Sequence, residues 1–119
     1  MKIFFYLSTC STCKRIMETL PLDSRVSLRD MKQNPISENE LETLKALSGS
    51  YESLFNKRAQ LYKQRDLKNK QLSEDDYKDL LLEHYTFLKR PALVLENQLF
   101  IGNASKTVEA AKKALNEQP

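Results

Sequence analysis

Apolar residues recur with two different spacings along the chain, and the spacing separates strands from helices. KIFFYL, residues 2–7, is a compact apolar run rich in aromatic residues, which predicts a buried strand. From Ser11 the apolar positions recur at helical spacing, up to a proline that stops the predicted helix. In RVSLRD, residues 25–30, Val26 and Leu28 alternate with polar residues, which predicts a short second strand.

The C-terminal part of the chain shows strand spacing again before a final helix. RPALVLENQLFIGN, residues 90–103, predicts a β-hairpin whose strands are ALVL and LFI, with Glu96-Asn97 as the turn. ASKTVEAAKKALNEQ, residues 104–118, is composed mainly of good helix formers and predicts a helix. The residues of this helix that are available for packing are Ala110, Ala111, Ala114 and Leu115.

Residues 37–88 show helical spacing and no strand signal. Ser37, followed three residues later by Glu40, is a capping-box pattern ahead of an apolar periodicity. The stretch SYESLFNKRAQLYKQ predicts a further helix that begins at Ser50. Ser73, followed by acidic residues, predicts the start of a third helix in this segment. The residues expected on one face of that last helix are Tyr77, Leu80, Leu81 and Tyr85.

The predicted order is therefore β-α-β, a helical segment, then β-β-α, which is typical of an α/β protein. A chain of 119 residues predicts a single domain over residues 1–119. No run approaches the roughly 20 apolar residues of a membrane span, and the N-terminal apolar run is too short for a signal peptide. We expect a cytoplasmic protein that does not bind membranes.

Charge adds little to this picture. The net charge of +3 is mildly basic, and residues 57–70 carry six Lys or Arg against a single Asp. The plainest interpretation of this segment is a solvated helix face, so we expect no direct nucleic-acid binding.

Both cysteines of the chain lie where the first strand passes into the first helix, as the C-x-x-C of Cys10 and Cys13. A cysteine at a helix start faces unpaired backbone N–H groups and the positive end of the helix dipole, which both favour the thiolate. Lys14 and Arg15 add positive charge nearby. We expect Cys10 to be the attacking thiol and Cys13 to resolve a mixed disulfide.

Two other interpretations of the cysteine pair stay open at this point. The thiols could be buried and inert. They could also be part of a zinc site, which needs three or four ligands. The one further soft ligand is His84, which is expected far along the chain inside a helix. We therefore predict no metal site.

Arg90-Pro91 precedes a predicted strand and supplies further candidate chemistry. A cis proline there would present backbone to a substrate, and the planar fork of Arg90 would stabilise a thiolate or a bound anion. A surface charge is the plain alternative for Arg90, as a solvated helix face is for Arg58.

Four stretches follow one another in a set order: FYLSTCSTCKR, LFNKR with a tyrosine four residues on, LKRPALVL and FIGN. Together they resemble the arsenate reductase family of the glutaredoxin-coupled type, which includes the Spx transcription regulators. The resemblance covers essentially the whole chain. It implies a thioredoxin-like fold whose core is formed by residues 1–31 and 89–119, with an all-helical insertion over residues 32–88.

The resemblance also implies roles for individual residues. Cys10 would be the reactive cysteine, Arg58 and Arg90 would face it, and Pro91 would be the cis proline of the fold. We expect a catalytic group of Cys10, Cys13 and Arg90. The residues expected to contact substrate are Arg58, Thr12, Lys14 and Pro91.

The chain departs from the reductase pattern at three places. A reductase arginine would fall at Asn56, whereas Arg58 follows two residues later, as in the Spx branch. A third arginine is replaced around Asn103. An oxyanion without these charge-assisted hydrogen bonds is bound less well, which predicts poor activity on arsenate itself. Cys13 resembles the Spx redox switch, because the reductases generally use one cysteine of their own.

Three functions stay open on the sequence alone. The favoured one is a thiol-disulfide oxidoreductase that uses glutathione or glutaredoxin, with no tightly bound cofactor. The second is an Spx-like regulator whose Cys10–Cys13 disulfide controls binding to RNA polymerase. The third is a binding module with idle cysteines. A monomer is expected in each case, and whether the chain is an enzyme is open.

Overall fold

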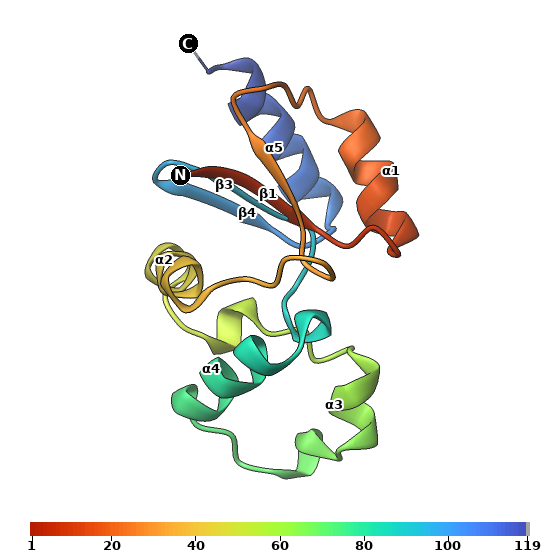
Figure 1. Cartoon of the computed structure of the whole chain (residues 1–119), viewed down its shortest axis with the longest axis vertical. Helices are drawn as coiled ribbons and strands as arrows, with labels where there is room; N and C mark the ends of the chain where they lie inside the picture. Colours follow the sequence, from red (N-terminus) through yellow and green to blue (C-terminus); the bar gives the residue numbers. More distant parts are fainter. Residues whose placement is uncertain (119) are drawn as a thin grey trace. The chain divides into compact units, whose positions relative to one another are not determined.

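The computed structural model describes residues 1–118 and divides into two compact units, which Figure 1 shows in sequence colours. The first unit combines residues 1–34 with the chain from Arg90 onward, and the second is Pro35–Lys89. Within the described residues, no helix has both the length and the apolar character that a membrane crossing needs.

The first unit is a four-stranded mixed sheet with two helices, in the strand order β2-β1-β3-β4. β1 pairs parallel with β2 and antiparallel with β3, and β3 pairs antiparallel with β4. This confirms the predicted α/β class and the β-α-β and β-β-α halves. The elements are β1 (Lys2–Tyr6), α1 (Ser11–Thr19), β2 (Ser27–Asp30), β3 (Ala92–Leu95), β4 (Gln98–Ile101) and α5 (Ser105–Asn116).

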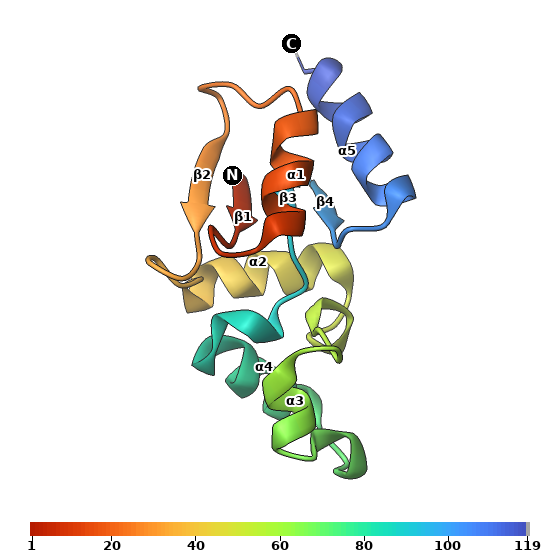
Figure 2. The ribbon, with the colours of Figure 1, turned by 90° about the vertical axis from the view of Figure 1, so that its right-hand side faces the viewer.

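The core of this unit lies where α1 and α5 pack on one face of the sheet, as Figure 2 shows from the side. β1, α1, β3 and α5 and the chain between α1 and β2 contribute buried apolar side chains to it, because burying apolar surface is the main stabilising term in folding. The buried members are Phe4, Ile16, Leu20, Val26, Leu93, Leu95, Ala111 and Leu115.

The second predicted strand is confirmed as β2, but the packing expectation for Ala110 was wrong. Leu28 is 54% exposed although it alternates with buried Val26, because β2 is an edge strand of the sheet. Ala110 is exposed, because the buried stripe of α5 follows Ala111 and Leu115 at a spacing of four residues.

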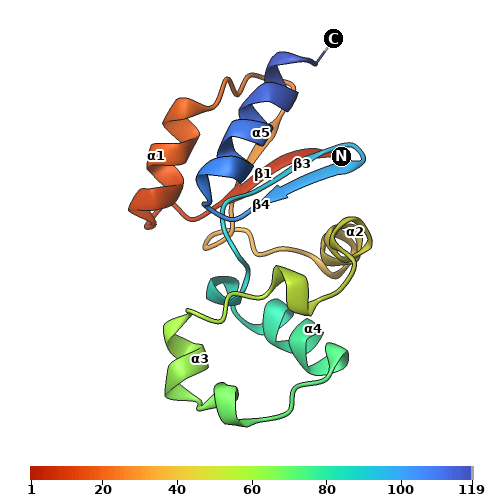
Figure 3. The same cartoon turned by 180° about the vertical axis from the view of Figure 1, so that it is seen from behind.

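The second unit is entirely helical and is visible from behind in Figure 3. The Ser37 capping box is confirmed: Ser37 N–H donates to Glu40 Oε1 at 2.9 Å, and Glu40 N–H donates to Ser37 Oγ at 3.1 Å. Ser73 forms the same box with Asp76. The elements are α2 (Glu38–Ser48), η1 (Glu52–Leu54), α3 (Gln60–Gln64), η2 (Leu67–Asn69), α4 (Glu74–Glu83) and η3 (Tyr85–Phe87), where η denotes a 3₁₀-helix.

The expected single helix from Ser50 to residue 64 does not form, because a bridge residue and a turn over residues 55–59 separate η1 from α3. There the Asn56 N–H donates to the Phe87 carbonyl at 2.7 Å, and Phe55 forms an antiparallel bridge with Leu88. The Phe55 ring is buried against the rings of Tyr62, Tyr77 and Phe87. This aromatic packing outweighs the local helical preference of the segment.

His84 does not lie inside a helix as predicted, because α4 ends at Glu83. Its ring Nδ1 accepts the Thr86 N–H at 3.2 Å and so caps the start of η3. A ring nitrogen that caps a backbone turn has a structural role here.

The Ser37 capping box leads to a stability prediction. Ser37→Ala removes the acceptor for the Glu40 N–H and is expected to lower the free energy of unfolding by about 1 kcal/mol. Urea denaturation measures this change. The matched control is Ser24→Ala at an exposed serine outside the helices, which should change the free energy of unfolding by less than about 0.5 kcal/mol. Equal effects of the two substitutions would contradict the prediction.

Candidate active site

The C-x-x-C lies directly after the carboxyl end of β1. The Cys10 N–H donates to the Leu7 carbonyl at 3.0 Å, which closes a tight turn after the strand. Cys10 is then the N-cap residue of α1, and its carbonyl accepts the Lys14 N–H at 3.1 Å as the first hydrogen bond of the helix. Cys10 is half-buried, whereas Cys13, one turn into the helix, is fully buried.

Several donors converge on the sulfur of Cys10. Partial burial opposes ionisation, but the backbone N–H and the thiol of Cys13 and the Arg90 side chain outweigh it, so the pKa of Cys10 lies below its ordinary value. The Cys13 N–H acts here by facing the sulfur, although Cys10 does not form a regular side-chain capping hydrogen bond. At neutral pH this arrangement favours the thiolate, which is the nucleophilic form.

Cys13 has the opposite electrostatic setting. Burial raises its pKa to about 11, and the neighbouring Cys10 sulfur acts in the same direction. Cys13 is therefore a protonated thiol at neutral pH, able to donate to Cys10 but poor as a nucleophile. The two cysteines differ in chemistry because they differ in exposure and in hydrogen bonding.

Arg90 and Pro91 reach the same site from the start of β3. The Arg90-Pro91 peptide bond is cis, as predicted, and the Pro91 carbonyl accepts the Gly102 N–H at 2.9 Å. Arg90 is half-buried and lies close enough to Cys10 to stabilise its thiolate. The structure thus brings together the three residues predicted as catalytic, Cys10, Cys13 and Arg90, although Arg90 is far away in the sequence.

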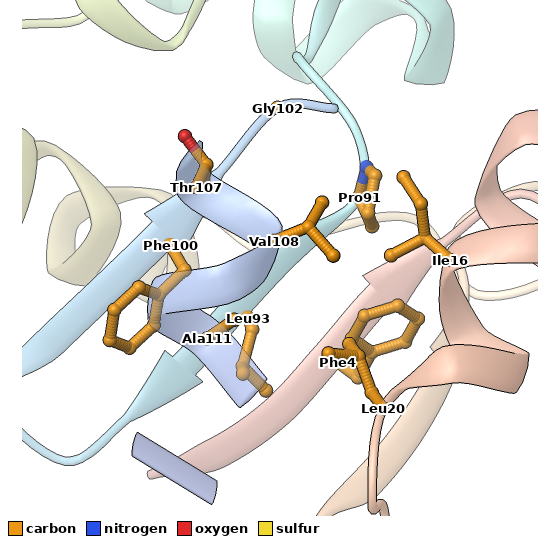
Figure 4. A pocket seen from close by; sticks show the side chains of 10 residues that line it. All are labelled: Phe4, Ile16, Leu20, Pro91, Leu93, Phe100, Gly102, Thr107, Val108 and Ala111. Carbon is orange, nitrogen blue, oxygen red and sulfur yellow. The ribbon is translucent and has the colours of Figure 1, made fainter. Parts of the chain in front are cut away.

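An apolar pocket lies between α1 and α5 and has Pro91 at one end (Figure 4). Its cavity volume is about 10 Å³, so the surrounding side chains nearly fill it. Ile16 and Val108 lie on its two helical walls, and Phe4 belongs to its floor on the sheet. It is a crevice in the apolar core and is too small to hold a substrate group.

The other residues expected to contact substrate are more dispersed. Thr12 is half-buried in the first turn of α1, and Lys14 is exposed on the same helix. Arg58 is exposed in the second unit, between η1 and α3, where its backbone N–H donates to Asn56 Oδ1 at 3.0 Å. That Arg58 faces Cys10 stays a prediction.

The described part of the chain gathers no set of ligands for a metal ion. Over residues 1–118 no three His, Cys, Asp or Glu side chains gather in a way that could hold a metal ion. His84 Nδ1 is engaged with Thr86, at 2.7 Å from its hydroxyl oxygen.

Asp30 is a site residue that the sequence interpretation missed. It lies at the carboxyl end of β2, and its Oδ1 accepts the Ser8 N–H from the loop before Cys10 at 3.2 Å. The same oxygen accepts the Lys32 N–H at 3.2 Å. The signal was its position: an acid at the end of a parallel strand, where the ends of neighbouring strands meet and sites form.

Fold and site together define a class: an α/β protein with a cysteine at the start of the first helix and a cis proline at the start of the third strand. The ArsC family model matches residues 5–111, which is most of the chain. The chain belongs to the ArsC family and has its thioredoxin-like fold.

Solved structures with this fold cover nearly the whole chain. An ArsC family related protein from Bacteroides fragilis matches with a TM-score of 0.77 and 25% identity over 93% of this chain and 97% of that chain. A possible arsenate reductase from Streptococcus mutans matches with a TM-score of 0.68 and 30% identity over 92% and 98%. An arsenate reductase from Vibrio cholerae has a TM-score of 0.74 and 19% identity over 96% of each chain, which shows the fold alone. A comparison with curated protein sequences finds no match.

The asymmetry of the two thiols predicts their reactivity. We expect the rate of Cys10 alkylation by iodoacetamide to rise with pH at a midpoint below that of an ordinary thiol, while Cys13 stays unreacted in the folded protein. Cys13→Ala and Arg90→Gln each remove a donor, so alkylation at pH 7 should slow about three- to tenfold. Mass spectrometry of the alkylated peptides measures both rates.

Cys13→Ser is the matched control for this experiment, because its hydroxyl keeps a hydrogen-bond donor near Cys10. It should slow alkylation less than Cys13→Ala does. Identical pH profiles for the wild type and both Cys13 variants would contradict a contribution from the Cys13 thiol.

Proposed function

We propose that the chain is an arsenate-reductase-like thiol oxidoreductase that acts on disulfides, with Cys10 as nucleophile. The observation that carries the proposal is the half-exposed Cys10 at the start of α1, whose pKa is lowered by Cys13 and Arg90. Membership of the ArsC family and a 30% identical structural neighbour described as a possible arsenate reductase support the same class of chemistry.

The reaction is a pair of thiol-disulfide exchanges. The Cys10 thiolate attacks one sulfur of a disulfide, the S–S bond breaks, and the other sulfur leaves as a thiolate. A second thiolate then attacks the mixed disulfide, restores Cys10 and forms a new disulfide. The new disulfide joins the external thiol to the second half of the substrate, and a second external thiol cleaves it, releases that half as a thiolate and forms the disulfide of the two external thiols. Two electrons thus pass from two external thiols to the original disulfide, and no bound cofactor is needed.

An external thiol is the better resolving group. Cys13 is buried with a pKa of about 11, so little of it is thiolate at neutral pH. Glutathione, or the thiol of a glutaredoxin, approaches the exposed side of Cys10 from solvent, so its ionisation is not opposed by burial as that of Cys13 is. We therefore assign resolution to such a thiol and not to Cys13.

Disulfides suit the site better than arsenate. In the first unit Arg90 acts on Cys10, while Asn103 replaces a further arginine expected from the family resemblance. Thr12 and Lys14 are proposed to contact the polar parts of the substrate, and the substrate contact expected of Arg58 stays a prediction.

Cysteine variants test the proposal with hydroxyethyl disulfide as substrate and glutathione as donor. Cys10→Ser should abolish turnover, because it removes the nucleophile. Cys13→Ser should keep at least about a tenth of the wild-type rate, because the external thiol still resolves the mixed disulfide. Coupled oxidation of NADPH by glutathione reductase measures turnover. Full activity of Cys10→Ser would refute the proposal.

A second candidate, a redox-sensing regulator like Spx, is favoured by the closeness of the two thiols, which hydrogen-bond to each other. A Cys10–Cys13 disulfide would then change the surface at the start of α1 and the affinity for RNA polymerase. Pull-down of polymerase by the reduced and the oxidised protein distinguishes the candidates. Equal or absent binding in the two states would eliminate the regulator.

A further inference from the structure

The carboxylate of Asp30 connects the end of β2 to the loop that carries Cys10. Tyr6, the last residue of β1, is level with Asp30 in the parallel register, so the two strands end at the same place. The Met31 N–H donates to the Tyr6 carbonyl at 2.9 Å and completes this end of the ladder. The chain after β1 therefore leaves the sheet directly beside the Asp30 side chain.

One oxygen of the Asp30 carboxylate accepts hydrogen bonds both from the loop before Cys10 and from the turn after β2. Oδ1 accepts the backbone N–H of Ser8 at 3.2 Å from the loop and that of Lys32 at 3.2 Å from its own turn. The Ser8 hydroxyl also bonds to the carboxylate and is the main reason why the pKa of Asp30 lies below its ordinary range. The carboxylate is thus a charged acceptor throughout the physiological pH range.

Ser8 belongs to the turn that sets the position of Cys10. The turn runs from Leu7 to Cys10 and is closed by the Cys10 N–H to Leu7 carbonyl bond at 3.0 Å. Asp30 holds Ser8 inside this turn. The donors that stabilise the Cys10 thiolate, on Cys13 and Arg90, act over short distances, so they require a fixed position of the sulfur.

We propose that Asp30 is a positioning residue for Cys10: through Ser8 it holds the loop so that the sulfur stays in reach of its donors. The inference rests on the proposed role of Cys10 as nucleophile. Asp30 does not act through its own charge, since a nearby negative charge would disfavour the thiolate.

The charge of Asp30 and its positioning effect would shift the pH midpoint of Cys10 alkylation in opposite directions, so the direction of the shift tests the proposal. Asp30→Ala removes both the charge and the acceptor. A positioning role predicts that the pH midpoint of Cys10 alkylation rises and that alkylation at pH 7 slows about tenfold, because small misplacements of a reacting group have large effects on rate. If Asp30 contributed only charge, the midpoint would fall instead.

Two further variants complete the series. Asp30→Asn keeps an acceptor oxygen of the same shape for the Ser8 N–H and should restore a rate near that of the wild type. Asp23→Ala is the matched control, because the Asp23 carboxylate lies before β2 and pairs with Arg25 at 2.8 Å. It should leave the midpoint unchanged.

Circular dichroism identifies any variant that fails to fold. If Asp30→Ala does so, Ser8→Ala takes its place: it removes the hydroxyl alone and should raise the midpoint to a smaller extent. A folded Asp30→Ala, or in its place Ser8→Ala, with an unchanged or lowered midpoint would overturn the positioning role while leaving Cys10 as nucleophile. A wild-type Cys10 that alkylates like an ordinary thiol would overturn both proposals.

Discussion

The candidate site depends on the position of β1 between β2 and β3. Parallel pairing with β2 brings the ends of both strands to one edge of the sheet, and antiparallel pairing with β3 brings the start of β3 to that same edge. Cys10 follows the first of these strands, Asp30 ends the second, and Arg90 precedes the third. Three segments that are distant in sequence therefore meet because one strand has these two neighbours.

The chemistry at this edge comes from a difference in solvent access between two similar thiols. Both belong to the first turn of α1 or its cap, yet Cys10 is half-exposed and Cys13 is fully buried. Burial keeps the proton on Cys13, and the proton on Cys13 stabilises the thiolate of Cys10. The Cys13 thiol thus donates a hydrogen bond that the Cys10 thiolate accepts. This gives Cys13 a role even where an external thiol completes the reaction.

Features that depend on residues close together in the chain could be predicted from the sequence. Features that depend on pairing between distant residues could not. The start of α1 at the cysteines and the Ser37 capping box were evident, because a cap or a strand-to-helix change involves residues close in the chain. The break after Phe55 was not evident, because Phe55 bridges Leu88 and the Asn56 N–H donates to the Phe87 carbonyl, both far along the sequence. Asp30 was missed for the same reason: its role follows from the strand register. The proximity of Arg90 to Cys10 was implied by the family resemblance and not by spacing.

The first unit is made from the two ends of the chain, with the whole second unit between them. During synthesis β1 and β2 emerge long before β3, and a sheet of two strands is marginal in water. β1 consequently has no antiparallel partner, and Cys10 has no Arg90 beside it, until the whole helical unit has been synthesised. The donors on Cys13 are local to the first helix, whereas the contribution of Arg90 to the thiolate requires that β3 has joined the sheet.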